Sequence, residues 1–164
     1  MTTKTYIQIW CDGSYRSEHR TIGFGWVRAH DGGQTETRSE KLPPLRDSHN
    51  HGSDVAEFSA FAGALAPLPD GSLVHVHMDC RNVVDALNAE RLSPKHMGMP
   101  AVKGAFERAV AQKKRMSDVQ ITFTSDSNPR MGEAHRLSRE ASTPPKGAKS
   151  LKRRGKHAHP VRGF

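Results

Sequence analysis

The stretch that decides the fold is YIQIWCDGS, residues 6–14, near the beginning of the chain. Its side chains alternate: Ile7, Ile9 and Cys11 fall on one face, and the other face ends in Asp12. A period of two residues is typical of a β-strand with two different faces. We therefore predict a strand over residues 5–12, with Asp12 at its end and a Gly-Ser turn after it.

The same alternation predicts four more strands. Residues 21–30 (TIGFGWVRAH) and 33–41 (GQTETRSEK) flank Asp31-Gly32-Gly33, and these three residues are typical of a hairpin turn. Residues 72–79 alternate valines with His75 and His77, and residues 119–124 (VQITFT) are rich in β-formers. The first three strands should form an antiparallel meander.

Apolar residues at helical spacing separate the later strands. They predict one helix from about Val55 to Pro67, one through Val83 and Leu87, one over residues 101–114, and a last one over residues 132–141. A strand followed by a helix and another strand favours a parallel crossover. The expected fold class is α/β, with a five-stranded mixed sheet of three antiparallel and then two parallel strands, flanked by helices.

Charge divides the 164 residues into two parts. Residues 143–164 hold seven Lys and Arg and no acid, which accounts for +7 of the net charge of +8. This segment has too little apolar content to pack, and we predict a basic, disordered tail after a single domain over residues 1–142. Cys11 and Cys80 lack metal or redox spacing and are expected to be reduced. We expect a cytoplasmic protein, because no stretch resembles a signal peptide or a membrane span. We also expect a monomer.

Three carboxylates lie in three different predicted elements. Asp12 ends the first strand, Glu57 lies early in the first helix, and Asp79 ends the fourth strand. Acids that converge from separate elements are typical of sites for hard divalent cations, which keep water and phosphate oxygens as their other ligands. The pattern predicts a metal site suited to phosphoryl chemistry.

Each acid alone also has an ordinary structural interpretation. Asp12 could begin a glycine turn, Glu57 could form a capping box with Asp54 as the N-cap, and Asp79 could be the N-cap of the next helix. The metal site is favoured because three such coincidences would otherwise have to occur in the right order. His49 and His51 lie in a loop and their spacing alone predicts no more than weak metal affinity.

Four motifs together resemble type 1 ribonuclease H. They are DGS at residues 12–14, GFGWV at 23–27, Glu57 in the first helix, and MDCRNVVDAL at 78–87. The resemblance covers roughly residues 5–142 and includes the order of the predicted elements. It implies a ribonuclease H fold and an endonuclease that hydrolyses the RNA strand of RNA/DNA hybrids.

The resemblance also implies roles for the site residues. It makes Asp12 a ligand shared by two Mg²⁺ ions, and Glu57 and Asp79 flanking ligands. The family's fourth ligand is an Asp in the last helix, but MGEAHRLSREA at residues 131–141 places His135 there. Imidazole suits Mn²⁺ better than Mg²⁺. We therefore expect Mg²⁺ or Mn²⁺ as cofactor, with His135 as a weaker ligand, a proton carrier or simply a solvated side chain.

Substrate contacts are expected from two regions. Ser14, Ser53 and Asp54 are the candidates for contacts to the 2′-hydroxyls that distinguish RNA from DNA. The tail residues Lys152, Arg153 and Arg154 are candidates for phosphate contacts, which add affinity without reading sequence. The mobile loop His of many family members is missing from TSDSNPRMG at residues 124–132, where Asp126 is the nearest titratable group.

Other functions stay open at this point. The main alternative is a weak or inactive protein of the same fold that binds RNA, DNA or a ribosome through its basic tail. A 3′ to 5′ exonuclease would need Asp-x-Glu on the first strand, where this chain has Asp12-Gly13-Ser14. A junction resolvase would share the acids and would form a symmetric dimer.

Overall fold

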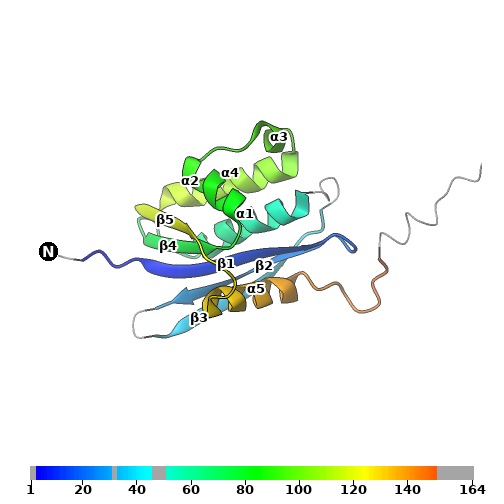
Figure 1. Ribbon diagram of the computed structural model, residues 1–164, viewed down its shortest axis with the longest axis horizontal. Coiled ribbons are helices and arrows are strands. Elements are labelled where there is room, and N and C mark those ends of the chain that lie inside the picture. The colour runs from blue at the N-terminus through cyan, green and yellow to red at the C-terminus, as the bar shows by residue number, and fades with distance from the viewer. Residues whose placement is uncertain (1–2, 31–32, 46–50, 151–164) are drawn as a thin grey trace, which may run out of the picture.

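A five-stranded mixed sheet forms the centre of the computed structural model, which describes residues 3–30, 33–45 and 51–150. The strand order is β3-β2-β1-β4-β5 (Figure 1). The strands are β1 (Ile7–Arg16), β2 (Thr21–Ala29), β3 (Thr35–Leu42), β4 (Leu73–Met78) and β5 (Asp118–Phe123). Strands β1 to β3 are antiparallel, whereas β4 runs parallel to β1, and β5 runs parallel to β4. The predicted sheet is confirmed.

Helices cover both faces of this sheet. Helix α5 (Pro129–Ala141) lies alone on one face, against β1, β2 and β3, and the other helices lie on the opposite face (Figure 1). These are α1 (Gly52–Leu65), α2 (Arg81–Ala89), α3 (Pro94–Met97) and α4 (Pro100–Arg115). Helices α2 to α4 form the crossover that joins the parallel strands β4 and β5. None of the helices in the described ranges is long and apolar enough to cross a membrane.

Two apolar cores result from this arrangement. The larger one lies between the sheet and helices α1, α2 and α4, and includes Ile9, Phe58 and Phe61. The smaller one lies under α5 and includes Trp10 and Met131. Alternate residues of β1 therefore pack into different cores, because both faces of this central strand are covered. Both cysteines are free, as predicted, and burial raises the pKa of the Cys11 thiol well above its usual value.

Strand β1 is longer than predicted. It continues through Asp12, Gly13 and Ser14 to Arg16, and these residues pair with Gly25 to Thr21 of β2. The predicted Gly-Ser turn after Asp12 is therefore wrong, and the turn comes later, at residues 17–20. The reason is tertiary: pairing with the glycine-rich β2 keeps the DGS segment extended.

Gly13 is required by the packing of α1 on β1. A Cβ atom on Gly13 would lie 2.2 Å from the backbone carbon of Ala56 and 2.5 Å from the backbone nitrogen of Glu57. These are backbone atoms, which cannot move aside as the end of a flexible side chain can. The absence of a side chain at Gly13 thus lets the first helix approach the strand at the residue next to Asp12.

The last helix also begins earlier than predicted, at Pro129 instead of Gly132. Asn128 is its N-cap, and its side-chain oxygen accepts hydrogen bonds from the backbone N–H groups of Arg130 (3.0 Å) and Met131 (3.2 Å). Asn followed by Pro is a usual start of a helix. After α5, residues 143–150 contain no helix or strand, and the rest of the predicted tail lies outside the described residues.

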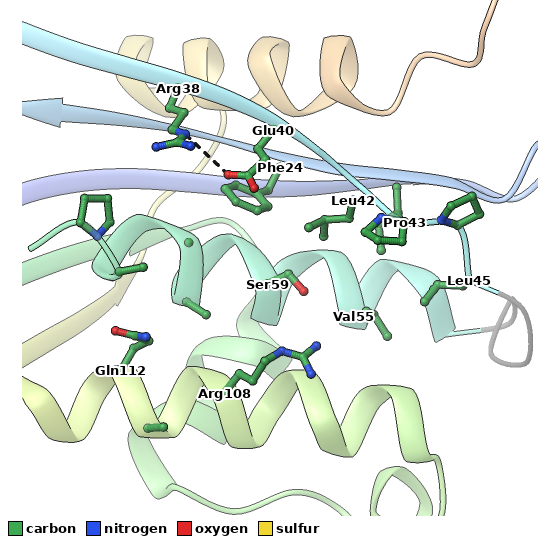
Figure 2. A pocket seen from close by; sticks show the side chains of 17 residues that line it. Phe24, Arg38, Glu40, Leu42, Pro43, Leu45, Val55, Ser59, Arg108 and Gln112 are labelled. Atoms are coloured by element: carbon green, nitrogen blue, oxygen red, sulfur yellow. Dashed lines mark ion pairs between the residues drawn. The ribbon is translucent and has the colours of Figure 1, made fainter.

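An apolar groove of about 620 Å³ lies between the β2–β3 ribbon and helices α1 and α4 (Figure 2). Phe24, Leu42 and Val55 line it, and the ion pair of Arg38 with Glu40 lies at its border (Figure 2). None of the predicted metal ligands belongs to its lining. This groove is therefore separate from the candidate site.

We predict that Gly13→Ala destabilises the protein by about 2–3 kcal/mol, because the methyl group would overpack against the α1 backbone. Gly98→Ala is the matched control, since the added Cβ would lie 3.6 Å from its nearest neighbour, an ordinary contact, at a φ of −81°. Urea unfolding monitored by circular dichroism measures both. Equal midpoints for the two variants would contradict the close approach.

Candidate functional site

The parallel pairing of β1 and β4 brings two of the predicted acids together. The register pairs Trp10 with His77, and extending it by two residues places Asp12 beside Asp79. Asp12 is almost completely buried, with 2% of its surface exposed, whereas Asp79 is half-buried. Asp12 and Asp79 therefore lie side by side, because each comes two residues after the last paired residues of β1 and β4, Trp10 and His77.

The third predicted acid, Glu57, reaches the site from helix α1. Its side chain is buried, and its Oε2 atom has no hydrogen-bond partner. Burial raises the pKa of Glu57 well above its ordinary value, and the negative charges of Asp12 and Asp79 raise it further. An unpaired, buried carboxylate oxygen is costly unless a proton or a cation satisfies it.

The crowding of acids is also visible at Asp79. Burial, followed by the charge of Asp12, raises the pKa of Asp79 from 3.8 to about 7. Two carboxylates in one partly buried place disfavour each other's ionised form. The donor set, three carboxylates with an orphaned oxygen, fits a hard divalent cation, which would relieve this repulsion.

His135 joins the acids from α5. Its Nδ1 atom lies 3.0 Å from Asp12 Oδ2, and its side chain is about half exposed to solvent. One ligand atom each of Asp12, Asp79 and His135 lie within 4.8 Å of one another, close enough to share one ion. The structure thus places His135 at the site, beside Asp12.

Ser138 is a site residue that was not predicted from the sequence. Its buried Oγ atom lies 2.7 Å from Asp12 Oδ2 and 2.8 Å from the backbone carbonyl of His135. A hydroxyl has one proton, so it donates to only one of these acceptors at a time. The spacing of three residues from His135 on a helix places both side chains on one face, and this was the available signal.

The two capping interpretations are wrong. Helix α1 begins after His51, Asp54 lies in its first turn, and the N-cap makes no side-chain hydrogen bond. Helix α2 has Cys80 as its N-cap, so Asp79 lies one residue outside the capping position. Neither acid has the ordinary role that would have explained it without a metal.

The predicted substrate residues are found in different settings. Ser14 is buried, and its hydroxyl accepts a hydrogen bond from Ser142 Oγ at 2.8 Å, so it faces the α5 side of the sheet. Ser53 is exposed in the first turn of α1. Asp54 lies near His51 and His96. The predicted contacts Lys152, Arg153 and Arg154 lie outside the described residues.

His77 is a structural residue. Its Nε2 atom lies 2.8 Å from Gln8 Oε1, its Nδ1 atom lies 2.9 Å from Thr124 Oγ1, and its ring stacks on Trp10. Burial lowers the pKa of His77 to about 4, which keeps the ring neutral. Both ring nitrogens are in use, so His77 has none left for a metal.

Comparison with known proteins gives structural matches only. No family model and no curated protein matches the sequence. RNase H1 from the halophilic archaeon Halobacterium salinarum superimposes with a TM-score of 0.67 at 18% identity, over 84% of this chain and 97% of that one. The N-terminal RNase H domain of a Mycobacterium tuberculosis protein gives 0.66 at 16%, over 85% and 100%.

A third structure is LC11-RNase H1, an RNase H1 isolated from compost and solved in complex with an RNA/DNA hybrid. It matches with a TM-score of 0.63 at 22% identity, over 83% of this chain and 96% of that one. The chain therefore has the ribonuclease H fold, and the candidate site is built from the central strand, the strand parallel to it, and one helix on each face.

We predict that Asp79→Asn stabilises the metal-free protein by about 1–2 kcal/mol at pH 8, a value reduced for partial solvent exposure. Because the folded pKa, about 7, lies above the ordinary 3.8, the wild type is not penalised below pH 4 and loses stability as the pH rises to 7. The two proteins should therefore have equal stability at pH 4.

Urea unfolding in EDTA from pH 4 to 8 measures this difference. Asp85→Asn, on the exposed surface of α2, is the control and should show no comparable gain. A variant that is less stable than the wild type at pH 8 would contradict the crowding of acids.

Proposed function

We propose that the protein is a metal-dependent endonuclease that hydrolyses the RNA strand of RNA/DNA hybrids, with two divalent ions, Mg²⁺ or Mn²⁺, as cofactors. The observation that carries the proposal is the convergence of Asp12, Glu57 and Asp79 at one edge of the ribonuclease H fold, with an unpaired buried oxygen on Glu57. A protein of this fold, LC11-RNase H1, has been solved with such a hybrid.

The three carboxylates would hold the ions. When bound, such ions activate water for attack on a phosphodiester and stabilise the leaving oxygen. The chain's own part is to present preoriented oxygen ligands: Asp12 is held by Ser138 and His135, and Glu57 is fixed by the packing of α1 at Gly13. No side-chain nucleophile is then needed.

His135 has two possible roles in this scheme, as a ligand or as a proton carrier. It lies on the solvent side of Asp12, with its side chain 48% exposed against 3% for Asp12. A half-exposed imidazole can exchange protons with water, and its neutral form can also bind a metal ion. Replacement of this residue separates the two roles, because a carboxylate restores a ligand and removes the imidazole.

Substrate contacts are proposed for two regions. Ser53 is exposed in the first turn of α1, the helix that carries Glu57, and is the best placed of the three predicted contacts for a 2′-hydroxyl. Ser14 is less well placed because it is buried and already bonded to Ser142. The cations Lys152, Arg153 and Arg154 are proposed to bind phosphates and to make affinity depend on salt.

We predict that Glu57→Gln lowers hybrid cleavage on the order of 100-fold or more, equivalent to at least about 2.7 kcal/mol of lost transition-state stabilisation. The control is Glu107→Gln, an exposed acid on α4 that is paired with Lys103, and it should keep full activity. Cleavage is measured in Mg²⁺ and in Mn²⁺ with labelled hybrid, double-stranded RNA, double-stranded DNA and single strands. This assay tests the substrate class and the cofactor together.

Cleavage confined to the RNA of the hybrid, and lost in Glu57→Gln and in Asp12→Asn, is the expected result. The alternative is a decayed nuclease that binds nucleic acid through its tail. Such a protein would show no cleavage with either metal, and its binding would be sensitive to salt and would disappear when residues 143–164 are removed. That pattern would overturn the enzymatic proposal.

We also predict that the wild type cleaves faster in Mn²⁺ than in Mg²⁺, and that His135→Asp reverses this preference. The reason is that Mg²⁺ favours oxygen ligands and Mn²⁺ accepts imidazole more readily. Initial rates at saturating hybrid, measured across a titration of each metal, give the two preferences. An unchanged preference in His135→Asp, with a lowered rate, would instead identify His135 as a proton carrier.

A further inference from the structure

A second group of potential metal ligands lies outside the acidic site, where helices α1 and α3 meet. It consists of His51, Asp54 and His96, each with about a quarter of its side chain exposed. Asp54 Oδ2 lies 3.7 Å from His51 Nδ1 and 3.5 Å from His96 Nε2. One ligand atom from each residue lies within 4.8 Å of the other two.

These distances fit ligands of a common ion better than hydrogen bonds. Both exceed the usual N–H···O range of about 2.7–3.2 Å. Two atoms that bind one Zn²⁺ at about 2.0–2.1 Å in a tetrahedral arrangement lie roughly 3.4 Å apart. The two His–Asp distances are therefore longer than hydrogen bonds and close to the spacing of two ligands on one ion.

The starts of helices α1 and α3 position the side chains of His51, Asp54 and His96. His51 is the N-cap of α1, and Asp54 follows three residues later, so both lie on the same side of the first turn. Helix α3 begins with Ser93 and Pro94, and Ser93 Oγ accepts a hydrogen bond from the backbone N–H of His96 at 3.3 Å. This short helix therefore has a defined start that presents His96 to α1.

The site is open on one side. Asp54 and His96 also line a cleft of about 610 Å³ that is bordered by α2 and by the segment leading into α3. Three protein ligands leave a fourth position of a tetrahedral ion free for water or another small ligand. The cleft gives an ion and such a ligand access from solvent.

We propose that His51, Asp54 and His96 form a second metal site, selective for Zn²⁺ and similar borderline cations over Mg²⁺. Two imidazoles and one carboxylate favour zinc, whereas the carboxylates around Asp12 favour hard cations. A bound ion would tie α3 to the start of α1. The proposal does not rest on the proposed nuclease activity, because none of its residues is one of the ligands proposed around Asp12, Glu57 and Asp79.

Site-resolved NMR of the full chain tests the proposal. The metal-free protein, labelled with ¹⁵N, is titrated with ZnCl₂ in the presence of excess Mg²⁺, and the imidazole nitrogens of all ten histidines are followed. One equivalent of Zn²⁺ should shift Nδ1 of His51 and Nε2 of His96. Shifts confined to His135 or to histidines outside this group would overturn the proposal.

Matched variants measure the affinity. His96→Ala should weaken Zn²⁺ binding on the order of 100-fold in calorimetry, because one of three ligands is lost. His30→Ala is the control, since His30 is an exposed histidine that is paired with Glu36 at the end of β2. Circular dichroism checks that both variants are folded. Equal Zn²⁺ affinity in His96→Ala and the wild type would show that the cluster is only a pair of His-Asp contacts.

Discussion

The close approach of helix α1 to strand β1 at Gly13 is the constraint on which the site depends. The helix backbone lies where a side chain at residue 13 would be, so the strand and the helix meet at a distance that only glycine permits. The same contact places Glu57 beside Asp12. Gly13 therefore has two effects: it lets α1 pack closely on β1 in the larger core, and it brings two of the three carboxylates together.

The acids are arranged at a cost in stability that a cation would remove. Burial and mutual repulsion raise the pKa of both Glu57 and Asp79, and Glu57 retains an oxygen without a partner. Groups of this kind are retained in proteins mainly where function requires them. In contrast, both ring nitrogens of the partly buried His77 have hydrogen-bond partners.

Most of the fold could be predicted from the sequence, since alternation and helical spacing are local signals. One error came from a tertiary effect, and the other from an overlooked local signal for the start of a helix. Pairing with β2 extends β1 beyond Asp12, and the Asn-Pro start moves α5 forward to Pro129. The triad of acids was predictable because Asp12 and Asp79 end strand-like runs and Glu57 lies early in a helical run. The contact of Ser138 with Asp12, and the meeting of His51 with His96 across 45 residues, depend on how the elements pack. The only local signal among them is the spacing of Ser138 from His135 on one helix face.

The hydroxyl of Ser138 has two acceptors within reach, Asp12 Oδ2 and the carbonyl of His135, so it can keep a hydrogen bond when the charge of the site changes. While Asp12 is the acceptor, the hydroxyl helps to hold a carboxylate that is almost completely buried. If that carboxylate oxygen turns to another partner, a rotation about the Cβ–Oγ bond points the hydroxyl hydrogen at the carbonyl of His135 instead, which lies at almost the same distance. The donor is then never left buried without an acceptor, so the acidic centre can change its ligands while helix α5 stays in place.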